Sequence, residues 1–264
     1  MCGICGCGEP AGQTKLKPVT GRPRYVFNPA SGYHTGIPAA ELNSSGQKRL
    51  LNIDQDLFAK NDIYAAQNRS FFRQHQILVL NLLSSPGAGK TTLLVETIKR
   101  MQDRIAIAVI EGDQHTERDA ERIRVAGVKA LQINTGRLCH LEADMIGKAV
   151  TQLNIEDRSL LFIENIGNLV CPSAFDLGES YKVVILSVTE GDDKPLKYPD
   201  MFHAADLLII NKTDLLPYVD FDVANCEEFA RRVNPNIKII RLSSTNHENF
   251  KAWTDWLSAG IETD

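Results

Sequence analysis

The sequence contains no long apolar run and no excess of basic charge. None of its hydrophobic stretches approaches the ~20 residues of a membrane-spanning helix, and its first residues lack the apolar segment of a secretory signal. Its 29 Lys and Arg residues are outnumbered by 33 Asp and Glu, for a net charge of −4, so no overall positive field attracts nucleic acid. We therefore expect a cytoplasmic protein with no membrane span and no nucleic-acid partner.

Cysteine is scarce and unevenly distributed. Three of the six cysteines, Cys2, Cys5 and Cys7, lie at the start of the chain. Because thiols stay reduced in the cytoplasm, this clustering predicts metal or redox chemistry rather than disulfide bonds. Cys226 lies in a predicted helix without a neighbouring ligand residue, and we expect it to be structural.

Composition divides the chain into four parts. Residues 1–8 hold the cysteine motif, and residues 9–46, rich in Gly, Pro, Ser, Thr and Asn, are expected to form a flexible linker. A helical pattern over 47–75 predicts an amphipathic helix that packs on the domain of residues 76–264, with a partner-docking face as the alternative. The apolar stripe expected on this helix has members seven residues apart: Leu50, Leu57, Tyr64 and Phe71, with Ile53 beside them.

Strands and helices alternate along residues 76–264. Continuous apolar segments such as ILVLNLLS, LLFIEN and LLIINK predict strands covered on both faces, which is typical of a parallel sheet. Helices are expected between such strands, for example over Gly89–Met101 and Leu141–Leu153. The alternation predicts a doubly wound α/β fold with a mainly parallel sheet.

A phosphate-binding loop is the strongest local signal. The segment SSPGAGKTT follows a predicted strand and opens a predicted helix, as in the pattern G-x-x-x-x-G-K-[ST], although Ser84 replaces the first glycine. Backbone N–H groups of such a loop point at phosphate oxygens, Lys90 is expected to reach the β and γ phosphates, and Thr91 to bind Mg²⁺. The predicted phosphate-binding residues are Gly87, Ala88, Gly89, Lys90, Thr91 and Thr92.

The segment NKTD indicates which base is bound. A carboxylate at Asp214 can accept hydrogen bonds from guanine N1–H and its exocyclic amine, a donor pair that adenine lacks. Asn211 can bond the other edge of the base, and the stem of Lys212 can lie over the ring. Ser243 is expected to back the base from a later loop. The predicted nucleotide is therefore GTP.

Two acidic residues at strand ends are candidates for catalysis beside Lys90. Glu164 ends the strand LLFIE and precedes Gly167 by three residues, where many GTPases have Asp in D-x-x-G, so it is expected to hold Mg²⁺. Asp113 could reach the metal or the attacking water, but a solvated strand-end cap is nearly as good an interpretation. No arginine is obviously placed to assist, so GTP hydrolysis should be slow.

A second set of metal ligands is expected within the domain. Cys139 and His140 are adjacent, and Cys171 follows Gly167 by four residues, just beyond the segment expected to sense the γ-phosphate. Thiolate and imidazole suit Zn²⁺, Ni²⁺ or copper rather than Mg²⁺. Only three ligands are visible, so the site could be shared across a two-fold interface. Buried cysteines that act as small hydrophobes are the alternative.

Together these stretches resemble the HypB family of hydrogenase maturation nickel GTPases, in the SIMIBI class of P-loop GTPases. The resemblance rests on MCGICGC, SSPGAGKTTLL, IEGDQHTERDAERI, QINTGRLCHLEADM, FIENIGNLVCPSAFDLGE, EGDDKPLKYPDMF and NKTDLLPYVDFD. Two departures stand out. The chain has six scattered histidines instead of a His-rich nickel-storage stretch, and residues 244–249 replace the more usual T-G-E-G.

The resemblance implies a cofactor and partner set. It implies a nickel site at Cys2, Cys5 and Cys7, where spacing alone leaves the metal open, and a nickel or zinc site at Cys139, His140 and Cys171. It further implies a homodimer on GTP binding, a HypA-type zinc-containing accessory protein, and delivery of nickel to the large-subunit precursor of [NiFe]-hydrogenase. A urease- or cobalamin-type metallochaperone GTPase and a nickel-buffering protein are the alternatives.

Overall fold

The computed structural model describes residues 26–27, 34–35, 44–113 and 118–263. The chain divides into two units, Met1–Leu57 and Phe58–Asp264. In the first, β1 (Val26–Phe27) pairs antiparallel with β2 (His34–Thr35), within the segment expected to be a linker. The cysteines at the start of the chain lie outside the described residues.

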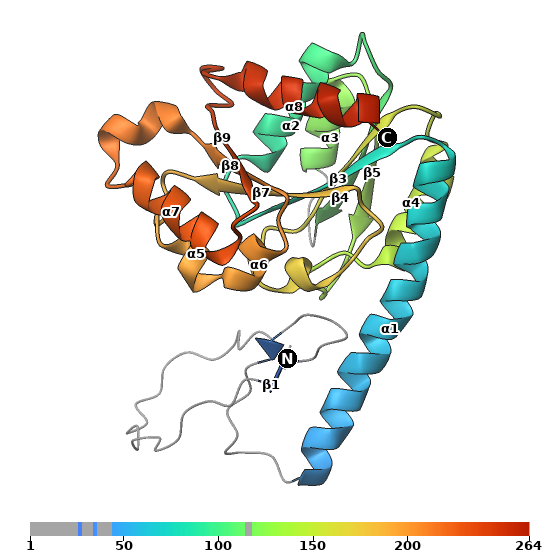
Figure 1. Ribbon diagram of the computed structural model, residues 1–264. Coiled ribbons are helices and arrows are strands. Elements are labelled where there is room, and N and C mark those ends of the chain that lie inside the picture. The colour runs from blue at the N-terminus through green and yellow to red at the C-terminus, as the bar shows by residue number, and fades with distance from the viewer. Residues whose placement is uncertain (1–25, 28–33, 36–43, 114–117, 264) are drawn as a thin grey trace, which may run out of the picture. The chain divides into compact units, whose positions relative to one another are not determined.

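The second unit is built on a parallel sheet. In the described part of the chain its order is β5-β4-β6-β3-β7-β8-β9, and every neighbouring pair runs parallel. The strands are β3 (Leu78–Ser84), β4 (Ile107–Asp113), β5 (Lys129–Asn134), β6 (Leu160–Glu164), β7 (Tyr181–Ser187), β8 (Leu207–Asn211) and β9 (Lys238–Arg241). The predicted doubly wound fold is confirmed, because the chain moves from β3 outward to both edges (Figure 1).

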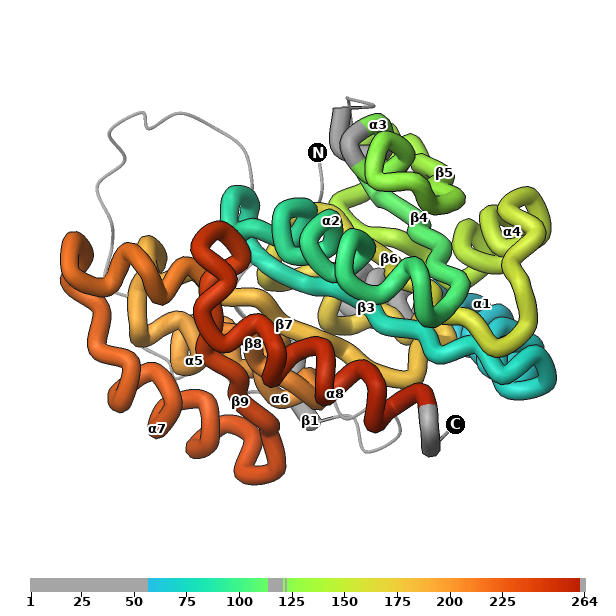
Figure 2. Tube along the Cα trace, turned by 90° about the horizontal axis from the view of Figure 1, so that it is seen from above, coloured from blue at the N-terminus to red at the C-terminus, as the bar shows by residue number. Residues whose placement is uncertain are grey.

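Helices cover both faces of this sheet. They are α1 (Ser44–Gln74), α2 (Lys90–Met101), α3 (Arg118–Val125), α4 (Ala143–Leu153), α5 (Lys194–Lys197), α6 (Pro199–His203), α7 (Val223–Val233) and α8 (Phe250–Thr263), with 3₁₀ turns η1 (Cys171–Ala174) and η2 (Thr213–Tyr218). Helices α2 and α8 lie over one face, and α5, α6 and α7 over the other (Figures 1 and 2). Among the described residues no helix is long and apolar enough to cross a membrane.

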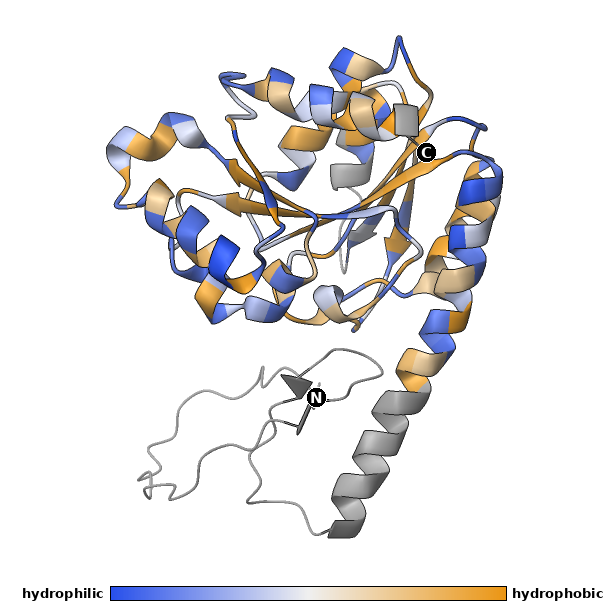
Figure 3. Cartoon of the chain, viewed as in Figure 1, coloured by the Kyte–Doolittle hydropathy of each residue, from blue (hydrophilic) through white to orange (hydrophobic). Residues whose placement is uncertain are grey.

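Each face of the sheet has its own apolar core. Trp253 of α8 is fully buried beneath α2 and donates a hydrogen bond from its indole N–H to Thr97 at 2.8 Å. On the other face, Met201, Phe202 and Cys226 pack against β7 and β8. The central strands β3, β6, β7 and β8 are accordingly mostly hydrophobic, and polar residues lie on the outer surfaces of the helices (Figure 3). Cys226 is thus a buried core thiol, and burial is the main reason that its pKa is raised to about 12.

Helix α1 packs on the domain through a face that differs from the predicted stripe. Phe71 is exposed, and Leu57 and Tyr64 are only half-buried. The predicted apolar stripe is therefore wrong for this part of the helix, and the side chains of Leu50 and Ile53, which complete the stripe, lie outside the described residues. The buried face follows a helical spacing of four, three and four residues: Asn61, Ala65, Asn68 and Phe72.

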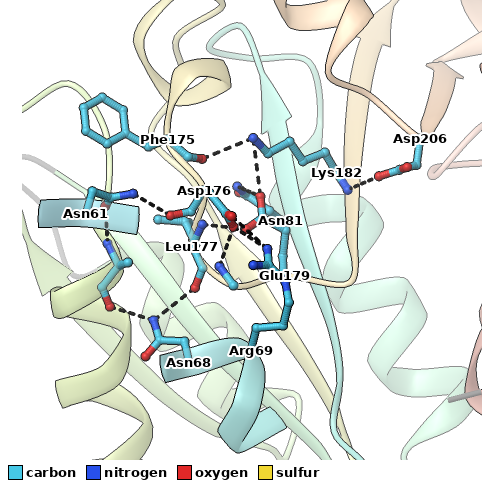
Figure 4. A network of polar contacts seen from close by, with 12 residues as sticks. Asn61, Asn68, Arg69, Asn81, Phe175, Asp176, Leu177, Glu179, Lys182 and Asp206 are labelled. Atoms are coloured by element: carbon cyan, nitrogen blue, oxygen red, sulfur yellow. Dashed lines mark hydrogen bonds and ion pairs between the residues drawn. The ribbon is translucent and has the colours of Figure 1, made fainter. Parts of the chain in front are cut away.

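Polar side chains hold this face of α1 against the loop that follows η1 (Figure 4). The Asn61 amide donates to the Asp176 carbonyl at 2.7 Å, and the Asn68 amide donates to the carbonyls of Ala143 and Leu177 at 2.7 and 3.0 Å. Arg69 donates to both carboxylate oxygens of Asp176 at 2.7 and 2.8 Å. Burial alone would raise the pKa of Asp176, but the hydrogen bonds that it accepts bring this pKa below its ordinary value.

We predict that Gly178→Ala detaches this face of α1 from the domain. Gly178 has a φ of +90°, and a Cβ there would lie 2.7 Å from the Asn68 Cβ and 2.8 Å from the Ala65 carbonyl oxygen. Backbone strain and overlap together should lower the free energy of unfolding by about 3 kcal/mol. Gly136 is the matched control, because its φ is +61° and its added Cβ would meet nothing within 4 Å. Gly136→Ala should cost only ~1 kcal/mol in urea titrations, and equal losses would contradict the close packing.

Candidate nucleotide and metal sites

The candidate site residues lie along the carboxyl edge of the sheet. The phosphate loop follows β3, Glu164 ends β6, and the NKTD segment begins at the last residue of β8. Because all the strands are parallel, these ends share one edge, where ligands of open α/β sheets bind. The order of the strands places β3 beside β6, so Thr91 and Glu164 come together although 73 residues separate them in sequence.

The phosphate loop runs directly into α2. Gly87 and Gly89 have φ values of +77° and +101°, which only glycine adopts readily. Helix α2 begins at Lys90, so the N–H groups of Lys90, Thr91 and Thr92 form the start of the helix, a favourable position for phosphate. Ala88 between the glycines is buried.

Ser84, the residue that departs from the usual pattern, contacts the key lysine. Its hydroxyl accepts a hydrogen bond from the Lys90 ammonium at 2.7 Å, and both side chains are buried. The Thr91 hydroxyl donates to Glu164 at 2.7 Å. A hydroxyl beside a carboxylate next to a phosphate loop is a donor set that fits Mg²⁺.

A further carboxylate lies beside Glu164. Glu111 on β4 is in register with Glu164 on β6, and the two are 3% and 5% exposed. Sequence reasoning missed Glu111 because it lies inside a strand, whereas Asp113, which was selected, ends the same strand and is half-buried. Two adjacent buried carboxylates favour a bound cation, since their negative charges repel each other.

The NKTD segment is bonded to the phosphate loop. The Asn211 amide donates to the Ala88 carbonyl at 3.0 Å, and the Lys212 ammonium donates to the Gly87 carbonyl at 2.6 Å. A Cβ on Gly89 would lie 2.5 Å from the Asn211 amide nitrogen, so the two loops are in close contact. The loops predicted to bind the base and the phosphates are therefore joined directly to each other.

A later loop supports the residues predicted to bind the base. The Asn211 side-chain oxygen accepts hydrogen bonds from the Ser244 N–H at 3.1 Å and its hydroxyl at 3.0 Å. The Ser243 hydroxyl donates to Asp214 at 2.5 Å. Ser243 is thus bonded to the carboxylate that is predicted to bind guanine.

Glu190, which sequence reasoning also missed, is a neighbour of the phosphate loop. It lies just beyond β7, accepts a hydrogen bond from the Ser85 hydroxyl, and accepts another from the Ser187 N–H at 3.1 Å. No local motif marks it, because its contact with Ser85 spans 105 residues.

Cys139, His140 and Cys171 come together beside this edge. Their potential ligand atoms all lie within 4.8 Å of one another. Cys139 and His140 come from the loop between β5 and α4, and Cys171 begins η1. His140 and Cys171 are both 8% exposed. A compact set of two sulfurs and one imidazole fits Zn²⁺ or Ni²⁺.

The surroundings of His140 keep its imidazole neutral. Its ring stacks on Phe175 with centroids 3.8 Å apart, and Phe58 of α1 packs on the same phenyl ring at 5.1 Å. Burial lowers the pKa of His140 to about 4. Its Nε2 is buried without a hydrogen bond, 3.6 Å from the nearest Glu142 oxygen. A neutral imidazole with an available ring nitrogen is the form that binds metal ions.

The parallel sheet, the phosphate loop and the guanine-type base loop define a P-loop nucleotide-binding protein of the GTPase class. A family model described as "CobW/HypB/UreG, nucleotide-binding domain" matches residues 78–241. The chain belongs to the HypB family within this group, because it is 52% identical to the hydrogenase maturation factor HypB of Azotobacter vinelandii over 97% of this chain and 91% of that protein.

Other relatives agree with this assignment. The hydrogenase maturation factor HypB of Escherichia coli K12 is 48% identical over 97% of this chain and 98% of that protein. A crystal structure of HypB from Helicobacter pylori in complex with nickel is similar in fold, with a TM-score of 0.72 and 42% identity, covering 77% of this chain and 96% of that one. The predicted resemblance to HypB is confirmed.

We predict that Asn211→Ala weakens GTP and GDP binding alike. The change removes the bond to the phosphate loop and two bonds to Ser244. Without these bonds the base loop loses its fixed position against the phosphate loop, and we expect a loss of about 1.4 kcal/mol or more in binding, which is ~10-fold or more in affinity. Asn234→Ala is the matched control, because the Asn234 amide also bonds several carbonyls but lies at the end of α7. Fluorescent-nucleotide titrations should show normal affinity for the control, and normal affinity for Asn211→Ala would contradict the bridging role.

Proposed function

We propose that the protein is a GTP-hydrolysing nickel metallochaperone that helps to insert nickel into the large subunit of [NiFe]-hydrogenase. The observation that carries this proposal is the position of the Cys139–His140–Cys171 cluster. Cys171 lies seven residues beyond Glu164, which bonds Thr91 of the phosphate loop. The names of the HypB relatives support hydrogenase maturation as the process, and the nickel complex of one of them supports the metal.

The nucleotide half of the proposal assigns a role to each residue. The Lys90 ammonium donates a hydrogen bond to the Ser84 hydroxyl in this structure. When GTP binds, the ammonium contacts the β and γ phosphates instead. Thr91 and Glu164 would hold Mg²⁺, which supplies positive charge to the phosphate oxygens. Asp113, the last residue of β4, would orient the attacking water. With no arginine assigned to the transferred phosphate, hydrolysis is slow.

The metal half of the proposal uses two sites. The internal cluster holds nickel or zinc, and Cys2, Cys5 and Cys7 of the N-terminal motif hold nickel. The segment between Glu164 and Cys171 changes with the nucleotide, so GTP binding alters the affinity of the internal site. By linkage, metal must alter nucleotide affinity by the same factor.

The partners follow from the chemistry of delivery. A three-ligand internal site leaves a coordination position for a ligand from a second copy, which favours a homodimer on GTP binding. A HypA-type accessory protein and the hydrogenase large-subunit precursor, both in the cytoplasm, are the proposed partners. A urease- or cobalamin-type role is the second candidate, but the HypB relatives favour the hydrogenase branch.

We predict measurable phosphate release from GTP that depends on Lys90. Lys90→Ala should lower the single-turnover rate by about 100-fold or more, because a charge that stabilises the transferred phosphoryl group is lost. Lys99→Ala is the matched control, since Lys99 lies on the same helix and is exposed. Its rate should equal that of the unmodified protein. Indistinguishable rates for the two variants would favour a nickel-buffering protein that does not use GTP chemistry.

We also predict that the internal metal ion depends on Cys139 and not on Cys226. In a full-length background with Cys2, Cys5 and Cys7 changed to Ser, Cys139→Ser should lose bound nickel or zinc after gel filtration. Cys226→Ser should retain it, because Cys226 lies on the buried side of α7, in the apolar core. Metal analysis by atomic emission gives the readout, and retention of metal by Cys139→Ser would place the internal site elsewhere.

A further inference from the structure

The segment from Glu164 to Cys171 touches the nucleotide site on one side and the metal cluster on the other. On the nucleotide side, Glu164 accepts from the Thr91 hydroxyl at 2.7 Å. Gly167 lies against the phosphate loop, where an added Cβ would meet Pro86 at 3.0 Å. On the metal side, the segment ends at Cys171 itself. The remaining ligands are on the loop after β5, so the geometry of the cluster depends on how this segment sits against that loop.

Asn165 forms a fixed anchor at the start of the segment. It is 1% exposed, and its side-chain oxygen accepts hydrogen bonds from the N–H groups of Leu141 at 3.3 Å and Ile166 at 3.0 Å. Its amide donates to Asn81 at 3.3 Å, and its own N–H donates to the Leu82 carbonyl at 3.1 Å. With four contacts inside the core, Asn165 holds the residue after His140 to the central strands.

Asn168 makes the second contact with the metal loop. Its amide donates to the Cys139 carbonyl at 3.3 Å, and its side-chain oxygen accepts from the Val170 N–H at 2.9 Å. Unlike Asn165 it is only half-buried. Asn168 follows directly after Gly167, which contacts the phosphate loop, and it precedes Cys171 by three residues.

We propose that Asn168 is the positioning residue that transmits the nucleotide state to the metal cluster. Asn165 holds the loop after His140 in place, Gly167 follows the phosphate loop, and the Asn168 amide moves the Cys139 backbone together with Gly167. Nucleotide-dependent displacement of the segment therefore shifts Cys139 and Cys171 relative to His140, whose neighbour Leu141 is held by Asn165. This inference rests on the proposed coupling between GTP and metal and names the contact that carries it.

The test measures nickel affinity in two nucleotide states. Full-length protein with Cys2, Cys5 and Cys7 changed to Ser is titrated with Ni²⁺ against a chromophoric chelator, with GDP or with a non-hydrolysable GTP analogue. The ratio of the two dissociation constants should be about 5-fold or more in this background. Asn168→Ala should bring the ratio close to one while its GDP-state affinity and melting temperature stay near those of the background.

Two further variants make the result specific. Asn168→Asp keeps an oxygen that can accept from the Val170 N–H, but it cannot donate to the Cys139 carbonyl. The ratio of its two nickel dissociation constants should therefore also fall close to one. Any effect of its added charge on the metal acts in both nucleotide states and cancels in the ratio. Asn234 at the end of α7 also donates to backbone carbonyls, and it is far from the segment in sequence. The Asn234→Ala variant should therefore show the same ratio of dissociation constants as the background protein.

The outcomes separate this inference from the proposed function. A background ratio above one that survives in both Asn168 variants would overturn the role of Asn168 and leave the coupling intact. A background ratio of one would overturn the coupling itself and the role of Asn168 with it. We predict a ratio of dissociation constants close to one in both Asn168 variants and an unchanged ratio in Asn234→Ala.

Discussion

The parallel direction of all seven described strands of the main sheet is the constraint on which the rest of the molecule depends. It brings every strand's carboxyl end to one edge, so loops separated by many residues meet there. The phosphate loop after β3 consequently contacts both Glu164 on the neighbouring β6 and Asn211 at the end of β8. Antiparallel neighbours would place these residues at opposite ends of the sheet.

The same constraint puts metal chemistry next to nucleotide chemistry. Strand β4 lies between β5 and β6, and the loops after β5 and β6 supply the three ligands of the metal cluster. Because β6 also neighbours β3, one segment after β6 touches the phosphate loop and ends at Cys171. The nucleotide-dependent shift that we propose for that segment would therefore reach the candidate metal ligands without passing through the core.

Sequence reasoning found the features that are local. The phosphate loop, the NKTD segment and the Cys139–His140 pair are short motifs, and the apolar strands have a simple pattern, so both the fold and most of the candidate residues were predictable. The contacts of Asn165 and Asn168 were not, because each joins segments 24 or more residues apart through a side chain and a backbone group. The buried face of α1 was missed because Asn61 and Asn68 pack there by hydrogen bonding, which an apolar pattern does not reveal.

Amide hydrogen exchange is the measurement that tests the shared segment most directly. The Leu141 N–H is bonded to Asn165 and reports the fixed contact between the segment and the loop after β5. The Val170 N–H is bonded to the side chain of Asn168 and reports the position of the residue that also contacts Cys139. If the account holds, replacing GDP with a non-hydrolysable GTP analogue changes the exchange rate of the Val170 amide together with those of the phosphate loop, whereas the Leu141 amide, held by Asn165, is unchanged. Changes confined to the phosphate loop, with the Val170 amide unaffected, would contradict it.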